Sequence, residues 1–263
     1  MSKGRTGGES AWEWLYGIVP VEEALKVGRR AVRELWVSSG RRDARIERLL
    51  GMARGIDVHW VSVRELDLMA RGGNHQGVMA KVDPLPREDM GEILEGQGPV
   101  LALEGIQDPR NLGAIIRSAV AMGAPRVVVE RRHAVSVTAT AAKAACGGLE
   151  HARMCIVPNL PRFLRKAKLE DYWVVGTADT GGMPLWEAQL PERVVVVVGG
   201  EGAGLRRVVR SQCDVWVTIP WEGPIGTYNA SVAASVVLYE LMRRRFEARD
   251  GSVRMGTGEV RSG

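Results

Sequence analysis

Hydrophobic positions repeat with helical and strand-like periods in turn from the start of the chain. In the first 83 residues, apolar side chains recur at one of these spacings in five stretches: 21–27, 34–38, 44–53, 57–61 and 77–82. Ser62, followed three residues later by Glu65, is a capping-box pattern that predicts one more helix. Alternating helices and strands are typical of a sheet covered by helices, so this region predicts a compact α/β unit.

The alternation stops between Asp83 and Pro99, where prolines, acids and glycines follow one another without sustained periodicity. We interpret residues 84–98 as a linker, because this composition is typical of domain boundaries. The linker separates a first domain, 11–83, from a second domain, 99–247, and 263 residues suit two modest domains. The polar, glycine-rich ends are expected to be disordered tails, at 1–10 and 248–263.

The second domain repeats the α/β pattern on a larger scale. Its apolar run Val194–Val198 is typical of a central strand that is buried on both faces of a parallel sheet. Further strands are expected at 100–104, 126–129, 154–157, 173–177 and 215–219, and helices at 112–122, 138–145 and 229–246. The second domain therefore predicts a doubly wound α/β architecture.

Composition narrows the class of protein. No apolar run approaches the roughly 20 residues of a membrane span, and the N-terminus lacks the apolar centre of a signal peptide, so we expect a cytoplasmic protein. The three cysteines form no CxxC pair and the four histidines show no HExxH spacing, so we expect neither a disulfide framework nor a metal site. The net charge of +5 is compatible with an anionic partner, and the excess of Lys and Arg lies wholly in residues 98–263.

Three segments of the second domain carry polar residues or glycines where a strand meets a helix, which is where open α/β sheets bind ligands. The first segment is 108–118. Its Asn111 can cap a helix, and Arg117 falls on the polar side of that helix, pointing away from the core toward a ligand above the strand. A plain surface arginine is the alternative interpretation.

The second segment, 199–205, directly follows the run Val194–Val198 and holds four glycines in its first six residues. Such a loop lets backbone N–H groups approach a ligand closely, which indicates a nucleotide-like ligand, although a tight turn is the alternative. A dinucleotide-binding Rossmann unit does not fit, because its glycine turn follows the first strand of the unit and only about 60 residues follow this one.

The third segment, 219–234, brings Thr227 and Asn229 from a proline- and glycine-rich loop to the start of an alanine-rich helix. There a hydroxyl and an amide either cap the helix or face a ligand. Capping alone is a sufficient explanation of Asn229.

Together the three segments resemble the SpoU/TrmH family within the SPOUT class of methyltransferases, whose motifs read roughly N-x-G-x-x-x-R, G-x-E-G-x-G and S-L-N-x-S-x-A. The first domain adds Tyr16–Val21, Leu66–Asp67 and His75–Val78, which look like the L30e-related substrate-binding domain of the 23S rRNA guanosine-2′-O branch. The resemblance covers nearly the whole chain. One departure is Tyr228, which stands where the family has a leucine beside the cofactor.

The resemblance implies a parallel α/β sheet with a deep trefoil knot, a homodimer formed through that domain, and an RNA 2′-O-ribose methyltransferase that uses S-adenosylmethionine and acts on 23S rRNA. The implied residues form three groups. The reacting centre is lined by Asn111, Arg117, Glu201, Thr227 and Asn229; the cofactor is held by Thr177, Gly199, Gly200, Ile219, Tyr228 and Ala230; RNA is contacted by Arg71, Asn74, His75 and Gln76. A simple polar turn is an equally good interpretation of the RNA group.

In this scheme a ribose 2′-hydroxyl attacks the methyl group in line. A guanidinium is a poor base, so we expect Arg117 to bind phosphate and polarise the 2′-oxygen. Glu201 is expected to order Arg117 or its loop, while Thr227 and Asn229 position the ribose or the cofactor.

Two other functions are open at this point. The same chemistry can act on tRNA, or on another rRNA nucleotide as in antibiotic-resistance methyltransferases. A function of another class is a non-catalytic RNA-binding or ribosome-assembly factor, in which Tyr228 has closed the cofactor pocket.

Overall fold

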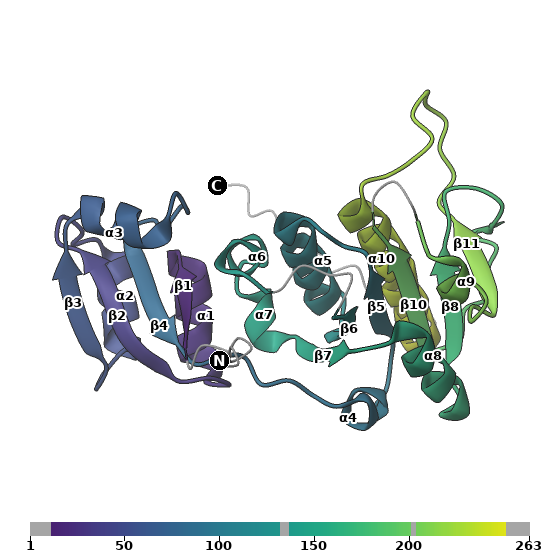
Figure 1. Ribbon diagram of the computed structural model, residues 1–263, viewed down its shortest axis with the longest axis horizontal. Helices are drawn as coiled ribbons and strands as arrows, with labels where there is room; N and C mark the ends of the chain where they lie inside the picture. The colour runs from purple at the N-terminus through teal and green to yellow at the C-terminus, as the bar shows by residue number, and fades with distance from the viewer. Residues whose placement is uncertain (1–11, 132–136, 201–203, 251–263) are drawn as a thin grey trace, which may run out of the picture.

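The computed structural model describes residues 12–131, 137–200 and 204–250, which form two sheets with their helices (Figure 1). The N-terminal sheet has the strand order β1-β4-β2-β3. Its strands are β1 (Glu13–Tyr16), β2 (Val32–Ser38), β3 (Asp57–Val61) and β4 (Val78–Val82), and its helices are α1 (Ile18–Val27), α2 (Ala44–Met52) and α3 (Val63–Ala70). The expected compact α/β unit is confirmed.

Local signals explain most of this first unit. The Ser62 hydroxyl accepts a hydrogen bond from the backbone of Glu65, whose carboxylate accepts one in return, so the predicted capping box starts α3. Strand β1 was not predicted, because its four residues depend on antiparallel pairing with the distant β4. Helix α1 begins three residues before the predicted Val21, since Pro20 lies in its first turn, where proline is tolerated.

The segment expected to be a linker, 84–98, contains the short helix α4 (Met90–Leu94). Asp89 caps this helix through the backbone of Gly91 and Glu92, and Ile93 is fully buried against the second domain's core. The buried guanidinium of Arg126 donates hydrogen bonds to carbonyl oxygens along residues 93–98. The connection between the two sheets is therefore held by the second domain.

The second sheet has seven strands, all paired in parallel, in the order β7-β6-β5-β10-β8-β11-β9. Its strands are β5 (Val100–Glu104), β6 (Arg126–Glu130), β7 (Arg153–Val157), β8 (Trp173–Thr177), β9 (Met183–Pro184), β10 (Val194–Gly199) and β11 (Val215–Thr218). Its helices are α5 (Pro109–Ala121), α6 (Ala139–Ala144), α7 (Gly148–His151), α8 (Leu160–Leu169), α9 (Arg207–Arg210) and α10 (Ala230–Asp250). The predicted parallel α/β sheet is confirmed.

The valine run occupies the centre of that sheet as predicted. Val194–Val198 are almost completely buried, and β10 lies between β5 and β8. Helix α8 was not predicted, although Asn159 caps it and its Pro161 lies in the first turn, where a helix accepts proline. The trefoil knot stays a prediction from the family resemblance.

The two sheets meet through β1 and α1 on one side and α6 and α7 on the other. Arg30 and Glu150 form a bidentate ion pair there, with N···O distances of 3.1 and 2.5 Å, and both side chains are buried. Within the described part of the chain, no helix is both long and apolar enough to cross a bilayer.

Candidate active site

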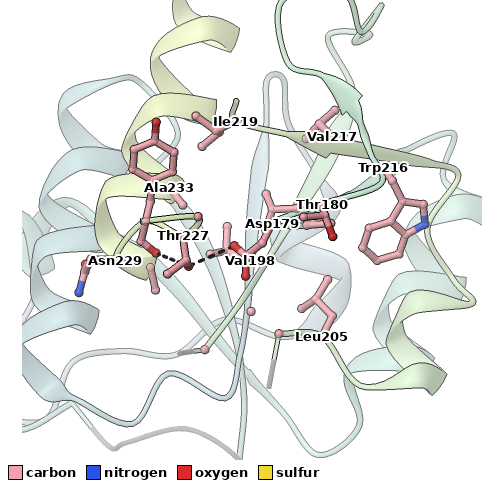
Figure 2. A pocket seen from close by; sticks show the side chains of 18 of the residues that line it. Asp179, Thr180, Val198, Leu205, Trp216, Val217, Ile219, Thr227, Asn229 and Ala233 are labelled. Carbon is pink, nitrogen blue, oxygen red and sulfur yellow. Dashed lines mark hydrogen bonds between the residues drawn. The ribbon is translucent and has the colours of Figure 1, made fainter. Parts of the chain in front are cut away.

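A cavity of about 580 Å³ opens at the carboxyl ends of β8, β10 and β11 (Figure 2). Figure 2 shows Asn229 and Thr227 on one side of the cavity, Asp179 in its middle and Trp216 on the other side. Its described lining consists of Thr177, Ala178, Asp179, Thr180, Val198, Gly199, Gly200, Gly204, Leu205, Arg210, Trp216, Val217, Ile219, Trp221, Gly226, Thr227, Tyr228, Asn229, Ala230 and Ala233.

Strand order explains why the cavity forms at this edge. The chain runs from β5 outward to β6 and β7, and then crosses β5 to form β8 and β11 on the other side. The loops after β8, β10 and β11 all lie on this second side, and their residues line the cavity. The cavity therefore lies beside the point where the strand order reverses, at the carboxyl ends, where open α/β sheets bind ligands.

Gly199 and Gly200 are required by backbone packing as well as by any ligand. A Cβ atom on Gly200 would lie 2.0 Å from the carbonyl oxygen of Gly105, and one on Gly199 would lie 2.8 Å from the carbonyl carbon of Gly204. A side chain at position 200 would therefore separate the loops after β5 and β10, which touch backbone to backbone, and one at position 199 would open the glycine loop itself.

An arginine anchors the chain just after this loop. Arg206 bonds through its guanidinium to the carboxylates of Glu104 and Glu130, which are both buried at the ends of β5 and β6. Its backbone N–H also donates to Glu104, at 2.9 Å. Two buried negative charges thus fix the start of α9, so this end of the glycine loop is rigidly attached to the sheet.

The third segment closes the opposite side of the cavity through side-chain hydrogen bonds. The Tyr228 hydroxyl donates to the carbonyl of Pro220 at 2.9 Å, so the tyrosine ties its loop back to the end of β11. Thr227 donates to the carboxylate of Asp179 at 3.3 Å, across the cavity. Asn229 accepts from the backbone N–H of Ser231 at 2.9 Å and so caps α10.

Eight of the predicted site residues line this one cavity. They are Thr177, Gly199, Gly200, Ile219, Thr227, Tyr228, Asn229 and Ala230. Asn111 joins them from the start of α5, because its Oδ1 accepts a hydrogen bond from the Asn229 amide at 3.2 Å. The three sequence segments therefore converge in space.

Two other predicted residues are not among the cavity residues. Arg117 lies on the exposed side of α5, and its guanidinium donates to the sulfur of Cys146 at 3.3 Å. Glu201 lies outside the described residues.

The residues expected to contact RNA lie in the first domain, in the loop between α3 and β4. Arg71, Asn74 and Gln76 are exposed. The His75 ring is buried: one nitrogen bonds to Asp67 at 3.0 Å, and the other accepts from the backbone of Gly77 at 2.9 Å. Because both ring nitrogens bond within the protein, His75 shapes this loop, and the geometry leaves it no free nitrogen for RNA.

Several cavity residues were missed. Asp179 and Thr180 follow β8, which ends at Thr177, and polar residues after a parallel strand were the available signal. Trp216 and Arg210 stack at the far side, with the guanidinium 4.9 Å from the ring centroid. These residues lie outside the three segments, and only the strand order brings β8, β11 and α9 together around one cavity.

Comparison with known proteins covers both domains. Residues 98–239 match the SpoU rRNA Methylase family, and residues 14–88 match the family described as RNA 2'-O ribose methyltransferase substrate binding. The 23S rRNA (guanosine-2'-O-)-methyltransferase RlmB of Pseudomonas aeruginosa is 39% identical over 244 residues, which is 90% of this chain and 98% of that protein. The RlmB of Salmonella typhimurium is 35% identical over 240 residues, with coverage of 89% and 99%.

Solved structures agree with these matches. The SpoU methyltransferase AviRb from Streptomyces viridochromogenes, in complex with AdoMet, is 25% identical with a TM-score of 0.77, over 90% of this chain and 92% of that one. An RNA 2'-O ribose methyltransferase structure is 26% identical with the same TM-score of 0.77, over 90% of both chains. The chain therefore belongs to the SpoU rRNA methylase family.

Proposed function

We propose that this protein transfers a methyl group from S-adenosylmethionine to the ribose 2′-hydroxyl of a guanosine in 23S rRNA. The observation that carries the proposal is the convergence of Asn111, Thr227 and Asn229 at a cavity at the carboxyl ends of parallel strands. Likeness over nearly the full length to 23S rRNA guanosine-2'-O-methyltransferases supports the choice of substrate.

The cavity residues suit S-adenosylmethionine. About 580 Å³ lies within the range of small-molecule sites. Val198, Leu205 and Ile219 offer an apolar surface for a flat ring, and Asp179 is the one acid among the described cavity residues. A single carboxylate suits a ligand that carries positive charge on sulfur and on its amino group. The bound cofactor supplies a methyl group on a positively charged sulfur, so no metal is needed.

The protein's own task is to hold the ribose in line with that methyl group. Asn111 and Asn229, bonded to each other, offer amide groups at the cavity edge for the ribose or the cofactor. Thr227 is held by Asp179 and presents its hydroxyl beside them. Arg117, whose Nη1 donates to Cys146, binds the phosphate next to the target ribose through its other N–H groups and polarises the 2′-oxygen.

The Tyr228 contact favours an enzyme over a non-catalytic RNA-binding factor. The Tyr228 hydroxyl bonds to the carbonyl of Pro220, and the ring stands at the side of a cavity that stays open. The non-catalytic factor was considered because Tyr228 was expected to close the cofactor pocket. The open cavity does not support that expectation.

A homodimer through the second domain is part of the proposal. Helix α10 buries Ala234, Val237 and Leu238, yet it exposes Val232, Val236 and Tyr239 at helical spacing. An apolar stripe on both sides of one helix is typical of a helix that packs against a second surface. A ribosomal RNA substrate also implies a cytoplasmic location.

Calorimetric titration with S-adenosylmethionine, together with methyl-transfer assays on protein-free 23S rRNA and on bulk tRNA, tests the function. We expect cofactor binding and 2′-O-methylation of 23S rRNA alone. Methylation of tRNA alone would contradict 23S rRNA as the substrate and identify tRNA instead. Absence of cofactor binding at millimolar concentration would contradict the proposed enzymatic function and favour the non-catalytic RNA-binding factor.

The role of Arg117 is tested by Arg117→Lys. A lysine keeps the charge but lacks the planar fork that grips phosphate and ribose together, so we expect turnover to fall by about a hundredfold with cofactor affinity unchanged. The matched control is Arg110→Lys, since Arg110 is highly exposed near the start of the same helix. Near-native turnover of Arg117→Lys would rule out the clamp.

A further inference from the structure

Three cations lie at or beside the contact between the two domains, and none of them forms an ion pair with an acidic side chain in the described ranges 12–131, 137–200 and 204–250. They are Arg45 from α2, Lys143 from α6 and Arg117 from α5. Figure 1 shows α6 between the N-terminal sheet and α5, and α6 contacts both β1 and α5. We call Arg45, Lys143 and Arg117 the cationic seam.

Lys143 is the central member of the seam. Its ammonium donates to the side-chain oxygen of Gln76, which crosses from the first domain. Gly17 leaves the room for this contact, because a Cβ atom there would lie 2.3 Å from the Lys143 Nζ. Burial lowers the pKa of Lys143, and the charge of Arg45 lowers it further, while Cys146 opposes the shift. Lys143 therefore carries its charge at an energetic cost.

Arg117 is connected to Lys143 through the end of α6. The backbone N–H of Cys146 donates to the carbonyl of Lys143 at 3.2 Å, and the Cys146 sulfur accepts from Arg117 at 3.3 Å. Among the described residues, the partner of the Arg117 guanidinium is thus a sulfur rather than a carboxylate. Another cation, Arg41, bonds to the backbone carbonyl of Gln76 at 2.6 Å, but the carboxylate of Asp43 neutralises it.

The seam lies between the two regions that bind RNA in the proposed function. Gln76 ends the exposed loop that begins at Arg71, and its side chain touches Lys143. On the other side, Arg117 shares helix α5 with Asn111, which reaches the cavity through Asn229. Contacts between neighbouring residues thus lead from the loop through Lys143 and α5 to the cavity edge.

We propose that the cationic seam binds the sugar-phosphate backbone of the RNA between the loop of the first domain and the cavity. The inference rests on the proposed function and names the surface that carries the RNA from one domain to the other. Neighbouring cations without acidic partners repel one another, and a polyanion removes that repulsion. Phosphate is the RNA group that satisfies all three, whatever the base sequence.

The test uses the full chain and two RNAs: protein-free 23S rRNA and a single-stranded oligonucleotide of mixed sequence. Kd is measured between about 50 and 300 mM salt for Lys143→Gln, Arg45→Gln and the parent protein. Each lost phosphate contact should reduce the slope of log Kd against log salt by about 0.7. Affinity at low salt should fall several-fold for both RNAs, and S-adenosylmethionine binding should stay unchanged.

Arg165→Gln is the matched control, because Arg165 is an exposed arginine on α8, away from the seam, and the change removes the same charge. Lys143→Arg should restore the salt slope. If Lys143→Gln and Arg165→Gln shared the parent's slope, the seam would not bind phosphate, whatever the change in domain stability. Failure of the parent protein to bind S-adenosylmethionine would instead contradict the proposed function, so the two failures are distinguishable.

Discussion

The two ends of the seven-stranded sheet are built for different tasks. At the carboxyl ends, glycines, threonines and asparagines surround an open cavity of about 580 Å³. At the amino ends, Arg126 fills the space with hydrogen bonds to carbonyls of residues 93–98 and to the Tyr172 hydroxyl, at 2.8 Å. Hydrogen bonds within the protein thus stabilise the amino ends of the strands, while the carboxyl ends leave room for a ligand.

An arginine and a tyrosine stabilise each end of the sheet, but they bond to different partners at the two ends. Arg206 holds the carboxyl end through two buried carboxylates, whereas Arg126 holds the amino end through neutral carbonyls. Tyr228 ties a cavity loop, whereas Tyr172 donates to the linker carbonyls near 3.1 Å. Paired substitutions at the two ends therefore test whether ligand binding and stability are separated along the strands.

The largest effect is expected for Arg206→Met. It removes the cation from the buried carboxylates of Glu104 and Glu130, which keep backbone N–H donors, so the free energy of unfolding should fall by about 4 kcal/mol. Cofactor affinity should fall as well, since the end of the glycine loop is released. Urea unfolding and calorimetry measure the two effects, with Arg207→Met as the exposed neighbouring control. A stable variant would mean that solvent already screens this cluster.

A smaller loss of stability is expected for Arg126→Met at the amino ends. The carbonyls of residues 93–98 lose a charged donor, which should cost about 2 to 3 kcal/mol of unfolding free energy. Cofactor Kd at 25 °C should not change, because the cavity lies at the opposite end. A tenfold weaker Kd in a protein that is still folded would break the separation of the two ends.

The smallest effects are expected for two tyrosine substitutions, one at each end of the seven-stranded sheet. Tyr172→Phe should lower the free energy of unfolding by about 1 kcal/mol and leave cofactor Kd unchanged, because it removes one buried hydroxyl from the amino end. Tyr228→Phe should weaken cofactor binding a few-fold with little change in stability, because its loop loses only the bond to Pro220. Equal effects of both variants on Kd would contradict the contrast.

Much of the fold was predictable from local patterns. The run Val194–Val198 indicated a central strand because a strand buried on both faces is apolar throughout, and Ser62 with Glu65 marked the start of α3. Helix α8 was not predicted, although its cap and its apolar face were both visible. Strand β1 gave too short a pattern, since its stability comes from a partner strand more than 60 residues away.

The candidate site was predictable where motifs are contiguous and not where they depend on topology. Thr227 and Asn229 stand together in one segment, and both line the cavity. Asp179 escaped prediction, because its place opposite Thr227 depends on the loops after β8 and β11 lying together. The buried ring of His75 was also unpredictable, since a polar loop residue gives no local sign that Asp67 will hold it.

The position of β10 has a consequence for how the protein is made. Its neighbours β5 and β8 are both synthesised earlier, yet β10 separates them in the finished sheet, where Val195 pairs with Val100 on one side and Val174 on the other. Contacts between such distant residues make folding slow. Until the valine strand has left the ribosome, the edges of β5 and β8 that pair with it lack this partner, and unpaired strand edges are prone to aggregation.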